Sequence, residues 1–296
     1  MQVAYFPGCT LSTKATGYDR SGKAVARSLN LLMEELPEWQ CCGATFPLST
    51  DNSLAMIAPT RILAQAQKAG GHVTTLCAIC FHVLRRTQNF LGSRPETLER
   101  INWFTEEPYA GKARVSHFLE LLRDEITWQA LSESVTRPLS GLKVAPYYGC
   151  LLLRPQNEIG LDNPDNPTIL HDCLSALGCE VVSFPYQSEC CGSYLAVSKP
   201  ELPEKLSKEI LASAQQHGAQ AIVTACPLCQ FNLDYPQRSG GGFVNPMPVF
   251  YFTQLMAVAL GLDQDNWGID HHYVDPLPLL ASYLQSTTAQ EKTANR

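Results

Sequence analysis

The chain has 296 residues, of which 45% are hydrophobic and 17% charged, a composition typical of globular domains with enough apolar material for a core. Its net charge of −6, from 22 basic and 28 acidic residues, argues against a nucleic-acid-binding protein, which needs a basic face. The amino terminus lacks the pattern of a signal peptide, and the most apolar long segment, residues 249–262, is interrupted by Thr253 and Gln254. We therefore expect a cytoplasmic protein without a membrane span.

The first half of the chain carries alternating strand and helix patterns. Short runs of β-branched and apolar residues predict strands, and apolar residues at a period near 3.6 predict helices. The expected strands are residues 2–6 and 72–76, and the expected helices are residues 20–36, 53–69 and a segment that follows residue 80. Alternation of this kind is typical of an α/β fold.

The second half carries the same kinds of pattern in the same order. Its expected strands are residues 143–148 and 221–225, and its expected helices are residues 166–177, 202–216 and a segment after residue 226, where Pro227 fits a first helical position. A polar stretch around residues 124–141 joins the halves. We expect three regions, namely residues 1–140, residues 141–285 and a disordered tail over residues 286–296.

Twelve cysteines are too many for an ordinary cytosolic chain. Disulfide frameworks belong to short secreted chains that cannot build a core, so cysteines at fixed spacings here indicate metal or redox chemistry. Ten of the twelve form two sets with one pattern: a leading cysteine, a Cys-Cys-Gly motif and a Cys-x-x-Cys motif. In both sets 35 positions separate the adjacent pair from the Cys-x-x-Cys motif. The first set is Cys9, Cys41, Cys42, Cys77 and Cys80, and the second set is Cys150, Cys190, Cys191, Cys226 and Cys229.

The residues around the cysteines repeat as well. Three blocks match in the same order in both halves: VAYFPGC (3–9) with VAPYYGC (144–150), TTLCAIC (74–80) with VTACPLC (223–229), and VSHFLELL (115–122) with VFYFTQLM (249–256). Such matches indicate an internal duplication. We therefore predict an α/β fold of two pseudo-symmetric duplicated halves, each carrying a CCG cysteine motif.

Five repeated thiols in each half suit some kinds of site better than others. A structural zinc site takes four ligands, commonly two Cys-x-x-Cys pairs, whereas each half has one such pair and a fifth thiol. A thioredoxin-like dithiol would leave the other repeated cysteines without a role. An iron–sulfur cluster fits better, because its several irons give adjacent thiolates different atoms to bind. The glycine after each pair is expected to take a positive φ and bring the backbone close to the cluster.

The pattern C…CCG…CxxC, present twice, resembles the CCG-domain proteins, and the layout of the whole chain looks like that of HdrB, a component of heterodisulfide reductase. The resemblance implies that the first set holds one noncubane [4Fe–4S] cluster and the second set another. It also implies reductive cleavage of a disulfide bound between the two clusters, such as the mixed disulfide of coenzyme M and coenzyme B. No catalytic side chain is assigned, because the clusters themselves are the expected catalytic centres.

The same resemblance implies partner subunits, namely an HdrC-like subunit with cubane [4Fe–4S] clusters, an HdrA-like flavoprotein, and a hydrogenase or another electron-input module. Splitting a disulfide takes two electrons, whereas iron–sulfur clusters pass one at a time, so two similar clusters facing one disulfide could each supply one. Two other classes stay open. One is an electron-transfer iron–sulfur subunit of another CCG-domain oxidoreductase, of the lactate or glycolate type, with no disulfide substrate. The other is a zinc-stabilised scaffold protein.

Several residues outside the two sets could have a function, but a structural role explains each of them more simply. Cys173 and Cys179 fit buried structural thiols better than cluster ligands. His82 could bond to a cluster sulfur or donate a proton, but a histidine on a helix face is more often packed or solvated. Three further features are expected to lack a catalytic role: the adjacent Arg85 and Arg86 as a solvated helix face, His271 and His272 as a surface loop, and residues 240–243 as a flexible connection.

Overall fold

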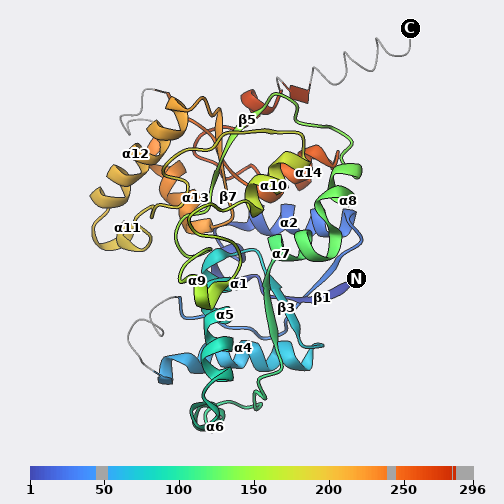
Figure 1. The fold of residues 1–296 in the computed structure, drawn as a ribbon, viewed down its shortest axis with the longest axis vertical. Helices are drawn as coiled ribbons and strands as arrows, with labels where there is room; N and C mark the ends of the chain where they lie inside the picture. The colour runs from blue at the N-terminus through green and yellow to red at the C-terminus, as the bar shows by residue number, and fades with distance from the viewer. Residues whose placement is uncertain (45–52, 239–244, 282, 285–296) are drawn as a thin grey trace.

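The computed structural model describes residues 1–44, 53–238, 245–281, 283 and 284. Over these residues each half of the chain forms a four-stranded parallel sheet surrounded by helices, as Figure 1 shows. The two sheets have the same strand order, which confirms the prediction of two duplicated α/β halves. The segment 240–243 and the tail 286–296 lie outside the described residues.

The sheet of the first half has the order β2-β1-β3-β4, with every pair parallel. Its strands are β1 (Gln2–Tyr5), β2 (Leu32–Glu35), β3 (His72–Thr75) and β4 (Arg114–His117). Its helices are α1 (Gly8–Leu11), α2 (Thr16–Ser28), the 3-10 helix η1 (Ser53–Met56), α4 (Ile57–Lys68), α5 (Ala78–Gly92), α6 (Pro95–Asn102) and α7 (Phe118–Leu121). Parallel strands need such helical crossovers, which bury the central strands on both faces.

The sheet of the second half has the order β6-β5-β7-β8, again all parallel. The π-helix η2 (Leu122–Ile126) and α8 (Trp128–Glu133) join the halves. The strands are β5 (Lys143–Tyr147), β6 (Glu180–Val181), β7 (Ala221–Thr224) and β8 (Val249–Tyr251). The helices are α9 (Gln156–Ile159), α10 (Ile169–Ala176), α11 (Leu195–Ser198), α12 (Glu201–Gln216), α13 (Pro227–Asp234), η3 (Tyr235–Gln237), α14 (Phe252–Ala259) and η4 (Gln264–Asn266).

One predicted helix is wrong in part. The helix expected over residues 20–36 ends at Ser28, and the chain turns at Asn30, which has a φ of 56°. Leu32–Glu35 then forms the edge strand β2, paired in parallel with Gln2–Tyr5. The apolar period continues past Ser28 because Leu29 and Leu31 are buried in the turn, where they anchor β2 rather than extend the helix.

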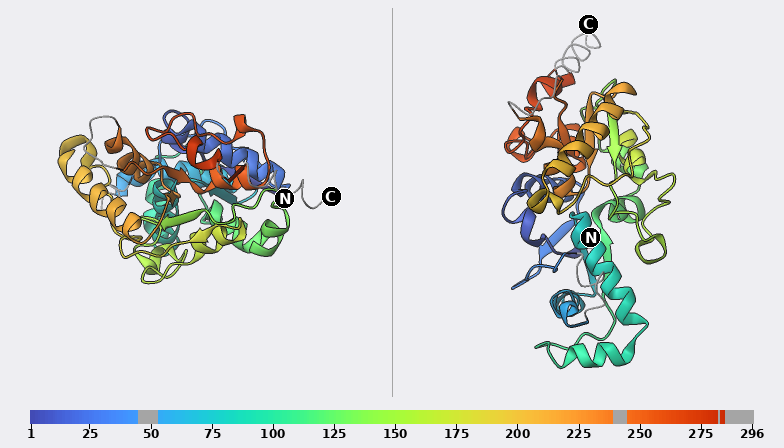
Figure 2. Two further views of the ribbon diagram at one scale, coloured as in Figure 1. Left: turned by 90° about the horizontal axis from the view of Figure 1, so that it is seen from above. Right: turned by 90° about the vertical axis from the view of Figure 1, so that its left-hand side faces the viewer.

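The two halves pack closely against each other. Helix α2 of the first half lies beside α14 of the second, near the middle of the molecule in Figure 1. The hydroxyl oxygens of Ser21 and Thr253 are 2.7 Å apart in this buried contact. The right-hand view of Figure 2 shows the two halves following one another along the long axis. Residues of both halves therefore meet at one internal interface.

No described helix is both long enough and apolar enough to cross a membrane. The most apolar long segment is divided between β8, α14 and the turn that follows α14. Its interruption by Thr253 and Gln254 falls within α14, where both side chains are buried and hydrogen-bonded.

Candidate functional site

The first set of cysteines gathers at the carboxyl ends of the first sheet. Cys9 lies in α1 just after β1, and Cys41 and Cys42 lie in the loop after β2. Cys77 is the N-cap of α5, and Cys80 lies in its first turn. The strand order reverses between β1 and β3, and parallel α/β sheets form their binding crevices outside the carboxyl ends at such a reversal. The sheet topology thus brings together residues that are 71 positions apart.

The second set has the same arrangement on the second sheet. Cys150 follows β5, Cys190 and Cys191 follow β6, and Cys226 is the N-cap of α13, whose first helical residue is Pro227 as predicted. Cys229 lies in the first turn of α13. All ten cysteines of the two sets are unpaired thiols. Each half therefore presents five free thiols at one sheet edge.

The adjacent cysteines of each pair face different partners. The sulfur of Cys41 is 3.7 Å from that of Cys9, and both residues are exposed, whereas the sulfur of buried Cys42 is 3.7 Å from that of Cys80. In the second set the sulfur of Cys191 is 3.5 Å from that of Cys229. Because the neighbouring thiols also contact different members of the set, the set suits several metal atoms bridged together better than a single ion.

Glycines make room for these sulfurs. A Cβ atom on Gly8 would lie 2.6 Å from the sulfur of Cys80, and one on Gly149 would lie 3.0 Å from the sulfur of Cys229. The glycine that follows each pair has a positive φ, 84° at Gly43 and 93° at Gly192, as the sequence predicted. The need for a residue without a side chain at positions 8 and 149 was not predicted, although Gly8 and Gly149 stand directly before the leading cysteine of their set.

The thiols perturb one another in both halves, but not in one pattern: the hydrogen bond with Cys42 raises the pKa of Cys41, whereas the hydrogen bond with Cys150 lowers the pKa of the equivalent Cys190. Hydrogen bonding from Cys41 and Cys80 lowers the pKa of Cys42, and hydrogen bonding from Cys229 lowers the pKa of Cys191. The pKa values of Cys80 and Cys229 are raised, first by the hydrogen bonds to Cys42 and Cys191 respectively and then by burial. The pKa of Cys190 falls to about 6, chiefly through its hydrogen bond with Cys150. In each set a thiol of the adjacent pair thus has a lowered pKa, which favours the thiolate, the form that binds metals.

The two sets meet at the interface between the halves. The amide of Ala78, inside the first Cys-x-x-Cys motif, donates to the carbonyl of Ala225, which precedes the second motif, at 3.3 Å. Tyr18 of the first half stacks on Tyr251 of the second with ring centroids 4.0 Å apart. Burial, and then the negative charge of nearby thiolates that include Cys77 and Cys226, raises the pKa of both phenols. The two Cys-x-x-Cys motifs thus share one buried, water-poor region.

A small cavity at this interface belongs to the second set. It has a volume of about 10 Å³ and is lined by Cys150, Cys191, Cys226 and Cys229 together with Ala78 and Ile79 of the first half. Within the described part of the chain, no three His, Cys, Asp or Glu side chains are arranged around one metal-ion position. Clustered free thiols, with glycines leaving room for their sulfurs, fit iron–sulfur chemistry.

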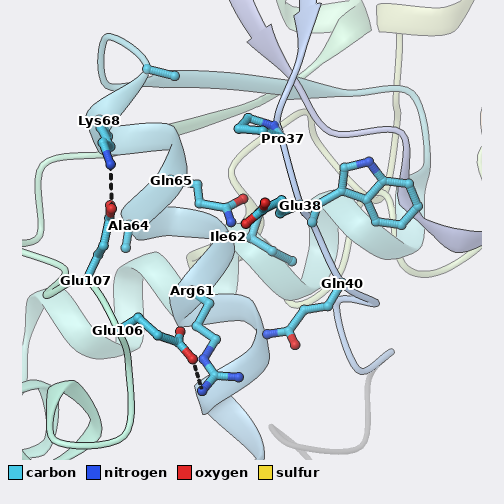
Figure 3. Close-up of a pocket in the computed structure, with 12 residues that line it drawn as sticks. Pro37, Glu38, Gln40, Arg61, Ile62, Ala64, Gln65, Lys68, Glu106 and Glu107 are labelled. Carbon is cyan, nitrogen blue, oxygen red and sulfur yellow. Dashed lines mark hydrogen bonds and ion pairs between the residues drawn. The ribbon is translucent and has the colours of Figure 1, made fainter.

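A groove of about 650 Å³ borders the exposed side of the first set. Trp39 and Gln40, which directly precede Cys41, line it together with residues of α4. Figure 3 shows two ion pairs in its wall, Arg61 with Glu106 and Lys68 with Glu107. Because both cations have carboxylate partners, the groove has no unpaired positive charge on α4 to attract an anion. No local pattern in the sequence indicates this groove, because it joins segments that are far apart in the chain.

The other candidate residues lie outside both sets. Cys173 is fully buried and Cys179 is 9% exposed, and burial raises the pKa of Cys173 and raises that of Cys179 to about 12. Both match the interpretation as structural thiols. His271 is exposed, whereas the ring of His272 is partly buried and bonds to the side chain of Gln254 at 3.1 Å, so only His271 fits the expected surface loop.

His82 and the two arginines of α5 have structural partners. His82 is buried and its Nδ1 lies 3.1 Å from the carbonyl of Leu151, while Arg86 lies 3.3 Å from its Nε2. Burial lowers the pKa of His82 to about 4. Arg85 forms two 2.7 Å bonds to Glu120, and Arg86 forms bonds of 2.7 and 3.2 Å to Glu158. The prediction of a solvated face is therefore wrong for the arginines, because acidic residues distant in sequence neutralise them.

Comparison with known proteins agrees with this geometry. The family described as CCG, cysteine-rich domain, matches residues 3–85 and 144–234. The 8-methylmenaquinol:fumarate reductase membrane anchor subunit of Wolinella succinogenes is 32% identical over 94% of this chain and 99% of its own length. The HdrB component of the ferredoxin/F(420)H(2)-dependent CoB-CoM heterodisulfide reductase of Methanosarcina acetivorans is 28% identical over 95% of this chain and 96% of its own length.

A solved structure shares the fold. The crystal structure of a hypothetical protein from Helicobacter pylori superposes with a TM-score of 0.73 at 12% identity, over 92% of this chain. The chain spans about half, 51%, of the length of that structure. At this identity the likeness concerns the fold alone. The family match, by contrast, covers more than half of the chain in two copies. The chain therefore belongs to the CCG cysteine-rich domain family, and it is similar along its whole length to the HdrB component of heterodisulfide reductase.

Proposed function

We propose that the protein is the disulfide-reducing subunit of a heterodisulfide reductase-type complex, with one noncubane [4Fe–4S] cluster in each cysteine set. The observation that carries this proposal is the presence of two complete five-thiol sets whose Cys-x-x-Cys motifs meet at one interface. The similarity to the HdrB proteins of two Methanosarcina species supports it. Two further points stay predictions: the division of the chain into regions 1–140 and 141–285, and a cytoplasmic location.

When bound, the two clusters would supply single electrons, so that a disulfide, two electrons and two protons give two thiols. The residues of the chain have separate tasks in this scheme. The five thiolates of each set would hold the cluster. The hydrogen bond from the Ala78 amide to the Ala225 carbonyl fixes the position of one Cys-x-x-Cys motif relative to the other. Buried apolar side chains such as Leu152 and Ile79 keep water from the shared region. Low local polarity strengthens every charge interaction there.

Electrons must reach the clusters from other proteins, because the chain carries no further cysteine set within its described residues. We propose an HdrC-like subunit with cubane clusters and an HdrA-like flavoprotein as partners, with a hydrogenase or another input module upstream. The exposed thiols Cys9 and Cys41 mark the side of the first set that is open to a partner. On this side an electron carrier can approach the first cluster without opening the interface between the halves.

A second candidate function follows from the Wolinella succinogenes relative, which is more similar to this chain than the Methanosarcina proteins are. Its name describes a subunit of a quinol-linked fumarate reductase. On that model the two clusters of this chain would pass electrons between a quinol and a partner dehydrogenase, with no disulfide substrate. This is a specific form of the electron-transfer alternative that the sequence left open.

Reaction of the clusters with disulfides separates the two candidates. The anaerobically reconstituted chain is reduced, its EPR signals are recorded, and candidate disulfides such as the coenzyme M–coenzyme B heterodisulfide are added. The first candidate predicts new EPR signals or oxidation of the clusters with a disulfide and neither effect with the two thiols that it yields. Unchanged signals with every disulfide, together with oxidation by a quinone or by a partner flavoprotein, would establish the second candidate.

A further inference from the structure

The side chain of Asn232 touches the second cysteine set in a way that has no counterpart in the first. Asn232 lies in α13 three residues after Cys229 and is 2% exposed. Its amide nitrogen lies 3.4 Å from the sulfur of Cys191, 3.2 Å from the carbonyl of Cys191 and 3.1 Å from the carbonyl of Ser193. Because carbonyl oxygens can only accept, the nitrogen and not the oxygen of the amide faces these atoms.

The equivalent position of the first half is occupied by Val83, three residues after Cys80. Val83 is fully buried, and its side chain has no hydrogen-bond donor. The backbone donors, by contrast, are the same in both halves. The amides of Gly43 and Ala44 hydrogen-bond to Cys41 and Cys42, and those of residues 192 and 193 hydrogen-bond to Cys190 and Cys191. The side-chain amide is therefore a donor to Cys191 that the equivalent Cys42 lacks, whereas in the first set the hydroxyl of Thr10 lies 3.9 Å from the sulfur of Cys9.

We propose that Asn232 is a positioning residue that orients Cys191 and raises the reduction potential of the cluster in the second set, making the two centres inequivalent. This inference rests on the proposed cluster binding. Reduction adds negative charge to a cluster, and an N–H donor on a ligand sulfur stabilises that charge, so hydrogen bonds to sulfur are among the factors that set cluster potentials. The donor here acts in a buried place, where water screens it little.

Two other differences between the halves act in the opposite direction. Glu189 places a negative charge next to Cys190, whereas the equivalent residue before Cys41 is the neutral Gln40. In addition, Cys9 and Cys41 are exposed, while Cys150 and Cys190 are half-buried. The total difference between the two potentials therefore mixes several causes. The contribution of Asn232 is isolated only by changing this residue and following each cluster separately.

The test is an EPR-monitored redox titration of the reconstituted full chain and of Asn232→Val. Valine at this position is compatible with a CCG loop, because the first half has it. We expect both proteins to hold eight irons and one of the two midpoint potentials to fall in the variant. A roughly tenfold change in the reduction equilibrium corresponds to about 59 mV for one electron. The other potential should stay unchanged. Val83→Ala is the matched control, since it alters the same site of the first half without adding a donor.

The outcomes separate this inference from the proposed function. Eight irons in both proteins with unchanged potentials, or an equal shift of both potentials, would overturn the role of Asn232 and leave the clusters in place. A wild-type chain that holds no iron would overturn both. If Asn232→Val does not assemble its second cluster, wild-type protein labelled with ¹⁵N-asparagine tests whether Asn232 bonds to that cluster's ligand. Pulsed EPR should then show a ¹⁵N coupling on one cluster signal, and its absence from both signals contradicts the proposal.

Discussion

At the scale of single residues, the adjacent cysteines of each pair have different surroundings. Cys41 lies near the exposed Cys9, and Cys42 lies near the buried Cys80, so the two thiols of one pair have different further neighbours. Gly43 lets the backbone turn after them, and Gly8 leaves the space that the sulfur of Cys80 occupies. The arrangement depends on backbone positions that tolerate no side chain. Substitution of these glycines should therefore affect the metal site before it affects the fold.

Gly8→Ala is expected to disrupt the first cluster selectively. The new methyl group would lie 2.6 Å from the sulfur of Cys80, and the φ of 72° is strained for alanine. Iron content should fall from eight to about four per chain, with the EPR signal of the second cluster retained. Gly92→Ala is the control, because no atom lies within 4 Å of its added methyl group and its φ is not positive. Full iron content in Gly8→Ala would contradict the assignment.

His117 gives the fold a dependence on pH. Its Nδ1 accepts from the amide of Leu119 at the start of α7, and its Nε2 bonds to the carbonyl of Leu76 at 3.0 Å, so the neutral ring is required. Burial lowers its pKa from 6.5 to about 4. Between these values the unfolded chain binds more protons than the folded chain. The free energy of unfolding therefore decreases as pH falls from about 6.5 to 4, by up to roughly 3 kcal/mol from this residue.

Denaturant unfolding of the apoprotein across this pH range measures the effect. Buried His82 and the partly buried His272 also have pKa values of about 4 and add to the slope in the same direction. His117→Asn should be less stable at pH 7 and should show a shallower dependence on pH than the wild type. Equal slopes for the two proteins would show that His117 does not titrate in this way.

At the scale of elements, the contact between α5 and α9 joins the Cys-x-x-Cys helix of the first half to the loop that follows Cys150 of the second. Arg86 binds Glu158 through two bonds, and Asn89 donates to the Glu158 carbonyl at 2.7 Å. His82 contacts the carbonyl of Leu151 one turn earlier on the helix. Side chains of α5 thus hold the segment that carries the leading cysteine of the second set.

Glu158→Gln should lower the free energy of unfolding by about 1–2 kcal/mol, because it removes the charge from a half-buried, two-bonded pair. Glu204→Gln is the matched control, since Glu204 pairs with Lys208 on the exposed face of α12 with both side chains 46% exposed. That change should cost less than about 0.5 kcal/mol. Denaturant titration of both variants gives the comparison. Equal effects would mean that the charge of Glu158 adds no more to stability than that of an exposed pair.

The sequence predicted the two central strands of each sheet and the longest helices, and it missed the edge strands, where tertiary contacts decide. The strands before the leading cysteines and the Cys-x-x-Cys motifs were predicted because their apolar residues and turns are local features. The edge strand β2 was not, since Leu32–Glu35 becomes a strand only by pairing with β1. Arg86 and Glu158 are 72 positions apart, so their pairing left no local pattern. Asn232 could have been found by setting the two halves side by side, where it faces Val83.

At the scale of the whole molecule, duplication places two similar sites on either side of one interface. The halves share their strand order, their glycine positions and the spacing from the adjacent cysteines to the Cys-x-x-Cys motif, yet they differ in solvent exposure and in the donor at Asn232. Similar sites in one buried region suit a reaction that needs two electrons from two one-electron centres. Because the two sites differ, one centre can face an electron carrier while the reduction potential of the other is set independently.

The central claim is that each cysteine set holds a four-iron cluster, and metal content tests it most directly. The chain is purified and reconstituted without oxygen, and iron and zinc are measured per chain by mass spectrometry. The account predicts about eight irons and no stoichiometric zinc, with about four irons after Cys77→Ser or Cys226→Ser and eight after Cys173→Ser. Well under eight irons in the wild type, or zinc bound in their place, would contradict it.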